Sequence, residues 1–350
     1  MSTAFWGKIE KLTSSLDVIV AFFVMMILGM IIIPLPAGLL DFMLIINIAL
    51  SITILLLTLF TKKVLEFSTF PTLLLITTMF RLALNISSTR LILTEGDAGA
   101  VIETFANVVT GSNFIVGAVI FIIIVIIQMM VVTNGASRVS EVSARFTLDA
   151  MPGKQMAIDA DLNSGLINED TAKQRRSDLE RETQFFGAMD GASKFVKGDA
   201  IAGLIITVIN LIGGIAIHSL QNGMPIMEAL TTFGKLTIGD GLVSQIPSLL
   251  ISVASGILVT RSGSIKGFGS SIGEELFHSP KVMMMLSVIL LLFAVMPGFP
   301  TIPFLLLGVA AGAAGYLLME NEKSKKSNQK AKEIRSKAAQ RTTQEKSTDE

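Results

Sequence analysis

Seven apolar stretches, each close to the length that crosses a lipid bilayer, recur along this 350-residue chain. A transmembrane helix needs about 20 predominantly apolar residues to cross about 30 Å of hydrocarbon. The seven stretches have 15 to 19 residues each: Val18–Ile33, Phe42–Phe60, Phe114–Val132, Ala200–Ile217, Leu242–Val259, Val282–Met296 and Thr301–Met319. An eighth stretch, residues 68–93, is long enough but contains Arg81 and Arg90. This recurrence predicts an all-α polytopic membrane protein.

The composition excludes several other classes of protein. Lys plus Arg and Asp plus Glu are 28 each, so no basic excess exists to neutralise the phosphates of a nucleic acid. The chain has no Cys and two His, which excludes disulfides and a Cys/His zinc site. The motifs of P-loop nucleotide hydrolysis, zinc proteolysis and serine hydrolysis are absent from the sequence. We therefore expect no enzymatic activity and no metal cofactor.

The distribution of charge along the chain supports eight transmembrane helices. If the chain crosses the membrane eight times, five of its segments lie on the same side as the N-terminus. These segments are residues 1–17, 61–67, 134–199, 260–281 and 320–350, and they contain 25 of the 28 Lys and Arg residues. Cytoplasmic segments carry such an excess of basic residues. The basic segments fall on one side only if the stretch that contains Arg81 also crosses the membrane. With that span included, both termini lie in the cytoplasm.

The predicted organisation has four parts. Residues 1–133 hold transmembrane helices 1–4, and residues 200–319 hold helices 5–8. Between them, residues 134–199 form a charged cytoplasmic loop, which has 11 acidic and 9 basic residues. Residues 320–350 contain almost no apolar residue and are predicted to be a disordered tail.

The two arginines of the third span are candidate functional residues. A cation at bilayer depth costs about 2.5–3.5 kcal/mol, so Arg81 is expected to face the bundle interior, a water path or a partner. Arg90 lies nine residues later, which puts it about 180° away on an ideal helix, unless the helix breaks at residues 85–88. The alternative for Arg90 is that its guanidinium merely reaches the membrane interface.

Two acidic residues next to glycines are further candidates. Asp199 immediately precedes the fifth span, and Asp240 precedes the sixth span on the opposite face of the membrane. A partly desolvated acid suits a proton relay, but an acid at this position also suits the N-cap of a helix. From the residues alone, the N-cap is favoured for Asp199.

Three long segments resemble the signatures of a known family, the FHIPEP family of flagellar and virulence type III export-gate proteins. The segments read FRLALNISSTRLIL (80–93), SEVSARFTLDAMPGKQMAIDADL (140–162) and DGASKFVKGDAIAG (190–203). The resemblance extends over nearly all of residues 15–320 and is strongest to the flagellar branch.

The resemblance implies a homo-nonameric ring in the bacterial cytoplasmic membrane. It implies that a proton gradient, or a sodium gradient, drives the export of unfolded flagellar proteins, with these ions transported and no cofactor bound. The implied partners are other export-gate membrane proteins, the export ATPase complex and the exported proteins. Family members also have a large soluble domain after the segment that corresponds to residues 320–350, and that domain docks chaperones. We therefore do not assign chaperone docking to residues 1–350.

The resemblance also implies roles for individual residues. Asp199 matches the family's proton acceptor, and the other residues matched to the ion pathway are Lys194, Asp240, Arg81 and Arg90. The cytoplasmic-loop residues expected at contacts between subunits are Arg138, Arg145, Asp149 and Lys154. With Asp199 so matched, we expect it to be functional rather than a cap.

Three alternatives stay open at this point. The chain could be a structural ring scaffold that conducts no ion, since a loop of balanced charge can pair across subunits. It could instead be a virulence injectisome homologue. A transporter of a small solute is disfavoured, because no internal repeat is evident and few polar residues interrupt the spans.

Overall fold

The computed structural model describes residues 3–111, 113–260, 279–296 and 299–320, with four isolated residues between 261 and 279, and side chains from residue 18 onward. All regular structure in these residues is helical, which confirms the predicted all-α class. The chain forms two compact units, which meet between Ile265 and Lys266. The helices of the first unit are α1 (Thr3–Ile32), α2 (Ala37–Phe60), η1 (Val64–Phe67), α3 (Phe70–Glu95), α4 (Gly99–Thr110), α5 (Phe114–Ile127), η2 (Gln128–Thr133), α6 (Asn134–Asn163), α7 (Glu169–Gln221) and α8 (Ile226–Thr260).

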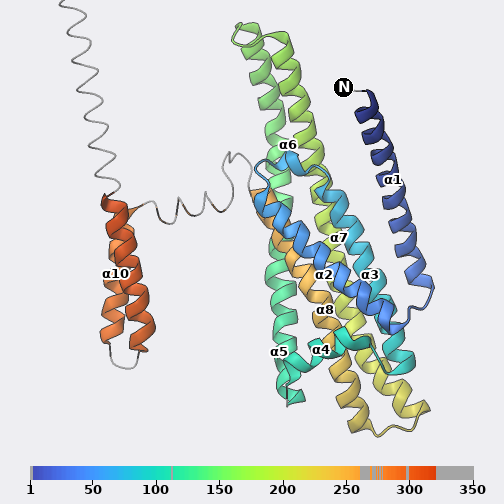
Figure 1. Cartoon of the computed structure of the whole chain (residues 1–350). Coiled ribbons are helices and arrows are strands. Elements are labelled where there is room, and N and C mark those ends of the chain that lie inside the picture. Colours follow the sequence, from blue (N-terminus) through green and yellow to red (C-terminus); the bar gives the residue numbers. More distant parts are fainter. Residues whose placement is uncertain are drawn as a thin grey trace, which may run out of the picture. The chain divides into compact units, whose positions relative to one another are not determined.

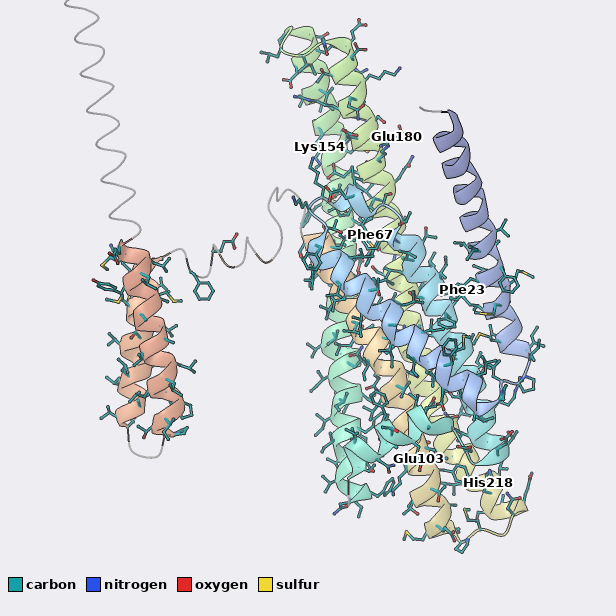
Figure 2. All side chains as sticks on the ribbon, viewed as in Figure 1. Phe23, Phe67, Glu103, Lys154, Glu180 and His218 are labelled. Atoms are coloured by element: carbon teal, nitrogen blue, oxygen red, sulfur yellow. The ribbon has the colours of Figure 1, made fainter. Side chains whose placement is uncertain are left out.

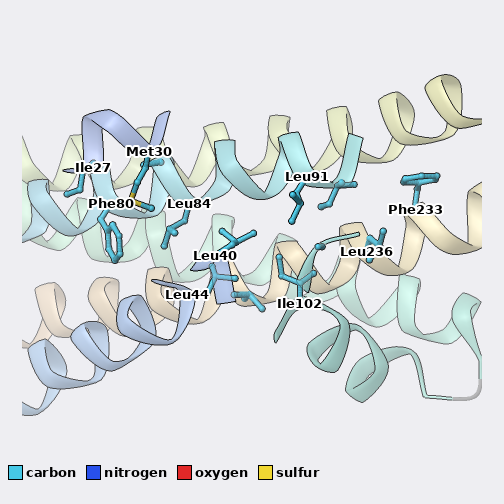
Figure 3. Packing of buried hydrophobic residues seen from close by; sticks show 14 of the residues in the cluster. Ile27, Met30, Leu40, Leu44, Phe80, Leu84, Leu91, Ile102, Phe233 and Leu236 are labelled. Atoms are coloured by element: carbon cyan, nitrogen blue, oxygen red, sulfur yellow. The ribbon is translucent and has the colours of Figure 1, made fainter. Parts of the chain in front are cut away.

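Helices α3, α7 and α8 pack against one another at the centre of the first unit. Helices α2 and α4 lie against α8, and α1 lies against α3 (Figure 1). The main apolar core joins five of these helices (Figure 3). Its residues include Ile27 and Met30 of α1, Leu40 and Leu44 of α2, Phe80 and Leu84 of α3, Ile102 of α4, and Phe233 of α8.

Six helices are long and apolar enough to cross a membrane, among the residues that the structure describes. The apolar parts of α1 (Val18–Ile32) and of α10 (Pro280–Val295) are helical but shorter. All eight predicted stretches therefore coincide with helices, while the count of eight spans stays a prediction.

The predicted charged loop is a helical hairpin made of α6 and the first half of α7. Helix α7 has 53 residues and is about 80 Å long at 1.5 Å per residue, so its first part extends well beyond its apolar part. The two arms of the hairpin bury Ile158 of α6 against Ala172 and Leu179 of α7. Figure 2 shows Lys154 and Glu180 on this hairpin, far from His218 near the other end of α7. This small apolar stripe gives the charged sequence an ordered structure.

Two segments that lie between predicted spans, residues 94–113 and 218–241, are also largely helical. Residues 94–113 contain α4, and most of residues 218–241 belong to α8. Helix α4 begins where the carboxylate of Asp41 accepts the backbone N–H groups of Ala100 and Val101, at 2.9 and 3.0 Å. Asp41 of α2 thus stabilises the N-terminus of α4.

The second unit contains a pair of helices, α10 and Thr301–Glu320. The hydroxyl of Ser287 donates a hydrogen bond to the carbonyl oxygen of Gly308 at 2.7 Å. Gly312, four residues on, also lies against the Ser287 side chain. The small residues therefore allow close helix packing. The predicted disordered tail lies outside the described residues from 321 onward.

Candidate ion site in the helix bundle

Arg81 of α3 and Asp199 of α7 form a buried ion pair between helices that are 118 residues apart in sequence. Their side chains are 3% and 2% exposed. The structure therefore places Arg81 toward the bundle interior and gives it an anionic partner. Helix α7 continues unbroken through Asp199, so this residue has no free helix N-terminus to cap, and the N-cap interpretation is wrong.

The ion pair leaves part of each charged group without a protein partner. Arg81 Nη1 and Asp199 Oδ1 are buried and make no hydrogen bond to any described residue. Buried polar atoms in proteins nearly always have a partner, either a protein group or ordered water. The pair is thus arranged so that the second carboxylate oxygen can accept a proton or a water hydrogen bond.

Polar residues continue from this pair along one face of α3. Asn85 and Ser88 follow Arg81 at intervals of four and seven residues, which places all three on the same face. The amide oxygen of Asn85 accepts a hydrogen bond from Ser244 of α8 at 2.5 Å. Asn85 on this face of α3 therefore has a polar partner on α8, within the interior of the bundle.

Asp240 lies at the other end of this polar face. It is 4% exposed, and Asn210 of α7 donates a hydrogen bond to its carboxylate at 3.0 Å. The hydroxyl of Ser88 instead donates to the backbone carbonyl oxygen of Asn85 on its own helix, at 3.1 Å. The sequence placed Asp240 in a connector, at the lip of the sixth span, but α8 begins 14 residues earlier, at Ile226. That placement and the N-cap interpretation of Asp240 are wrong, because the connector residues are themselves helical.

A polar cavity of about 50 Å³ lies among these groups. Its lining includes Arg81, Asp199, Asp240, Ser244 and Gln128. A water molecule requires about 10–15 Å³ of such space together with polar partners, so the cavity has room for a few waters. The cavity therefore extends from the ion pair to Asp240 between polar and apolar side chains.

Gln128 belongs to this site, although sequence reasoning did not assign it a role there. It is buried, lines the cavity and keeps Nε2 without a protein hydrogen bond among the described residues. It begins the π-helical segment η2, which joins α5 to α6. A lone amide in the apolar stretch 114–132 was the available signal, and π-helical turns occur frequently at functional sites.

Lys194 and Arg90 do not join the Arg81–Asp199 pair. Lys194 Nζ lies 2.7 Å from the carboxylate of Asp190, and this hydrogen bond raises the pKa of Lys194. The guanidinium of Arg90 donates to the carbonyl oxygens of Ile31 and Ile32, at 3.4 and 3.0 Å. Arg90 thus binds the last carbonyls of α1, and α3 shows no break at residues 85–88.

The four loop residues expected at subunit contacts lie on α6. Lys154 pairs with Glu182 of α7 at 3.1 Å, and Arg138 lies 3.6 Å from Glu141 on its own helix. Arg145 and Asp149 are exposed and form no ion pair within the described part of the chain. Their role between subunits stays a prediction.

His218 is a buried residue that the sequence did not single out. Its Nε2 lies 3.2 Å from the carbonyl oxygen of Leu93, and its Nδ1 lies 2.9 Å from the amide nitrogen of Asn222. Its ring also packs on Phe233, with the two ring centres 4.4 Å apart. Both nitrogens are occupied, so His218 connects α7 to α3 and α8 near their ends.

Comparison with known proteins identifies the family. The model of the FHIPEP family matches residues 27–350. The chain belongs to the FHIPEP family. It is 51% identical to the flagellar biosynthesis protein FlhA of Salmonella typhimurium over 315 residues, which are 88% of this chain and 46% of that protein. For FlhA of Bacillus subtilis, the identity is 52% over 321 residues, covering 92% of this chain and 47% of that protein.

A third FHIPEP relative has a different name. The low calcium response locus protein D of Yersinia pestis is 49% identical over 308 residues, covering 87% of this chain and 44% of that protein. The chain thus spans less than half the length of these relatives. No solved structure matches the chain.

Proposed function

We propose that this chain is a membrane component of the flagellar type III protein export apparatus and couples proton movement to export, with Asp199 as the proton acceptor. The observation that carries the proposal is the buried Arg81–Asp199 pair beside a polar cavity of about 50 Å³. The family membership, the identity to FlhA and the apolar helices support an inner-membrane export component.

Protonation of Asp199 has a specific structural consequence. The carboxylate becomes neutral, and the Arg81 cation is left buried without its counterion. Breaking a buried pair by removing one charge costs about 3–5 kcal/mol. A proton that crosses about 150 mV releases about 3.5 kcal/mol, at about 2.3 kcal/mol per 100 mV. The two energies are of the same order, so the free energy of one proton offsets much of the cost of breaking the ion pair that joins α3 to α7.

Helix α7 supplies a route from the broken ion pair to the charged hairpin. It runs without a break from Glu169, through Asp199, to Gln221. A movement of the helix at Asp199 therefore moves the arm of the hairpin that lies 30 residues away. In this proposal the hairpin, which carries Arg145 and Asp149, passes the change to neighbouring subunits of a nonameric ring and to the export partners.

Sodium is the alternative transported ion. Asp240 combines a carboxylate with the amide of Asn210, whose Oδ1 is buried and makes no hydrogen bond to a described residue. Oxygen atoms of this kind are the ligands that hard cations prefer. A virulence injectisome function is the second candidate, because the Yersinia protein is nearly as similar as the flagellar proteins.

The test is proton flux in membrane vesicles that contain the chain, measured with export in cells that carry the same variants. Asp199→Asn keeps the size of the side chain and removes its proton exchange, so flux and export are expected to fall about 100-fold. Asp178→Asn is the matched control on the same helix, because Asp178 is exposed and accepts a hydrogen bond from Gln174 at 3.1 Å, away from the cavity. Unchanged flux and export in Asp199→Asn would reject the relay and favour a scaffold that conducts no ion.

A further inference from the structure

A second, larger pocket reaches Asp199 from the surface of α7. It has a volume of about 400 Å³, and Gly191, Gly198 and Ala202 of α7 form its small-residue wall. Leu82 of α3 and the side chains of Lys194 and Phe195 complete the lining, which is mostly apolar apart from Lys194 and Asp199. We refer to this pocket as the α7 vestibule.

The vestibule exists because these positions of α7 carry almost no side chain. Gly191, Gly198 and Ala202 are separated by seven and four residues, which puts them on one face of the helix. A Cβ atom added at Gly191 or at Gly198 would meet no atom within 4 Å. Glycine inside a helix is destabilising relative to alanine, and no packing within the described chain requires it here. Within this chain, the glycines therefore leave space open at the surface of α7.

Asp199 is the one residue that lines both this vestibule and the internal polar cavity. It is 5% exposed, and its Oδ1 has no hydrogen-bond partner among the described residues. The Arg81–Asp199 pair consequently stands between an open space on the α7 surface and the cavity that extends toward Asp240. A proton that passes from one space to the other meets the carboxylate of Asp199.

The polar groups of the vestibule lie on the side of the charged hairpin. Lys194 is one turn before Gly198, and its ammonium binds Asp190 at 2.7 Å. Lys194 is exposed and lines the pocket, whereas Asp190 is half-buried, so the Lys194 ammonium is the part of this ion pair that stays in contact with water. The vestibule thus has a wet rim on the hairpin side and a buried carboxylate at its inner end.

We propose that the α7 vestibule is a water-filled access route through which Asp199 exchanges its proton with the hairpin side of the membrane, and that Gly191 and Gly198 keep this route open. The proposal rests on the proposed role of Asp199 as proton acceptor. It adds the direction of access and the residues that maintain it.

The experiment uses the absence of cysteine from the chain. Single variants Gly198→Cys, Gly187→Cys and Ser248→Cys in membrane vesicles are treated with a membrane-impermeant thiosulfonate that carries an ammonium group. Gly187 is an exposed glycine of the same helix outside the vestibule, and Ser248 lines the internal cavity. The proposal expects Gly198→Cys to react from the hairpin side about tenfold faster than Ser248→Cys, because only a solvated thiolate reacts rapidly.

The functional readout separates this proposal from the role of Asp199. Labelled Gly198→Cys is expected to lose proton flux, whereas unlabelled Gly198→Cys and labelled Gly187→Cys keep it. A size series supports the same conclusion if Gly198→Ala retains flux and Gly198→Leu loses it. Failure of Gly198→Cys to react, or reaction only with a membrane-soluble reagent, would show that lipid or another copy covers the groove and would overturn the vestibule. Full flux in labelled Gly198→Cys, together with lost flux in Asp199→Asn, would also overturn it while Asp199 keeps its role.

Discussion

The buried Arg81–Asp199 pair is expected to show strong energetic coupling in a double-mutant cycle. Arg81→Leu leaves the Asp199 carboxylate buried and unpaired, and Asp199→Leu does the same to the guanidinium. Each single change should cost about 3–5 kcal/mol, because an uncompensated charge stays in the interior. Replacing both by leucine removes both charges and should be nearly neutral or stabilising. The coupling energy is therefore expected to exceed about 3 kcal/mol.

Thermal unfolding of the purified chain in detergent or nanodiscs measures this coupling. A change of 1 kcal/mol shifts the midpoint by about 2–4 °C in a domain of 150–250 residues, so each single variant should lose roughly 6–20 °C. The double variant should unfold close to the unchanged chain while it exports nothing. The matched control is the exposed pair Lys154–Glu182, whose cycle should give no more than about 1 kcal/mol. Additive losses at Arg81 and Asp199, within about 0.5 kcal/mol, would refute the buried pair.

Three further changes test other contacts of the bundle. At Gly239 a Cβ would overlap the carbonyl oxygen of Ile102 in α4, so Gly239→Ala should destabilise the chain by about 1–3 kcal/mol in thermal unfolding. The control is Gly203→Ala, whose added Cβ meets no neighbour within 4 Å and which should be neutral or stabilising. Asp41→Ala removes the acceptor for two N–H groups of α4 and should cost about 1 kcal/mol, with faster hydrogen exchange confined to the start of that helix; unchanged exchange there would contradict the cap. Gln128→Leu removes a buried side chain whose Nε2 has no hydrogen-bond partner among the described residues, so the midpoint of unfolding should stay the same or rise while proton flux in vesicles falls. A flux equal to that of the unchanged chain would exclude Gln128 from the path.

The positions of the apolar helices could be predicted from the sequence because they depend on local composition. Each stretch is apolar over about the thickness of a bilayer. Within the membrane, such a stretch satisfies its backbone hydrogen bonds by forming a helix. The ends of the helices were less predictable. Asp240 follows a glycine and precedes an apolar run, which is the pattern of a helix start, yet α8 begins at Ile226. Acids and glycines inside a helix suggest a connector when their tertiary contacts are unknown.

The partner of Arg81 could be anticipated in kind but not identified from the residues. The cost of a buried cation required an acidic or polar group nearby, and Asp199 was one of several acids within reach of the bundle. Its selection depends on how α3 packs on α7, over a separation of 118 residues. Asn85, Ser88 and Ser244 were missed for the same reason. Hydroxyls and amides are common in helices, and only the packing shows that these face one another.

The hairpin and the candidate site are connected through both arms of the hairpin. Helix α7 carries Asp199 and continues as one arm, without interruption. The other arm, α6, continues from the π-helical segment η2, whose first residue, Gln128, lines the same cavity as Asp199. A π-helical turn contains an extra residue, and its conversion to α-helix rotates the helix after it by about 100° per residue. In the proposed mechanism, protonation at the cavity would act on one arm through the continuous helix α7 and on the other through the π-helical segment η2. Since the two arms are packed together through Ile158, Ala172 and Leu179, movement of one arm relative to the other has to reposition the whole charged hairpin.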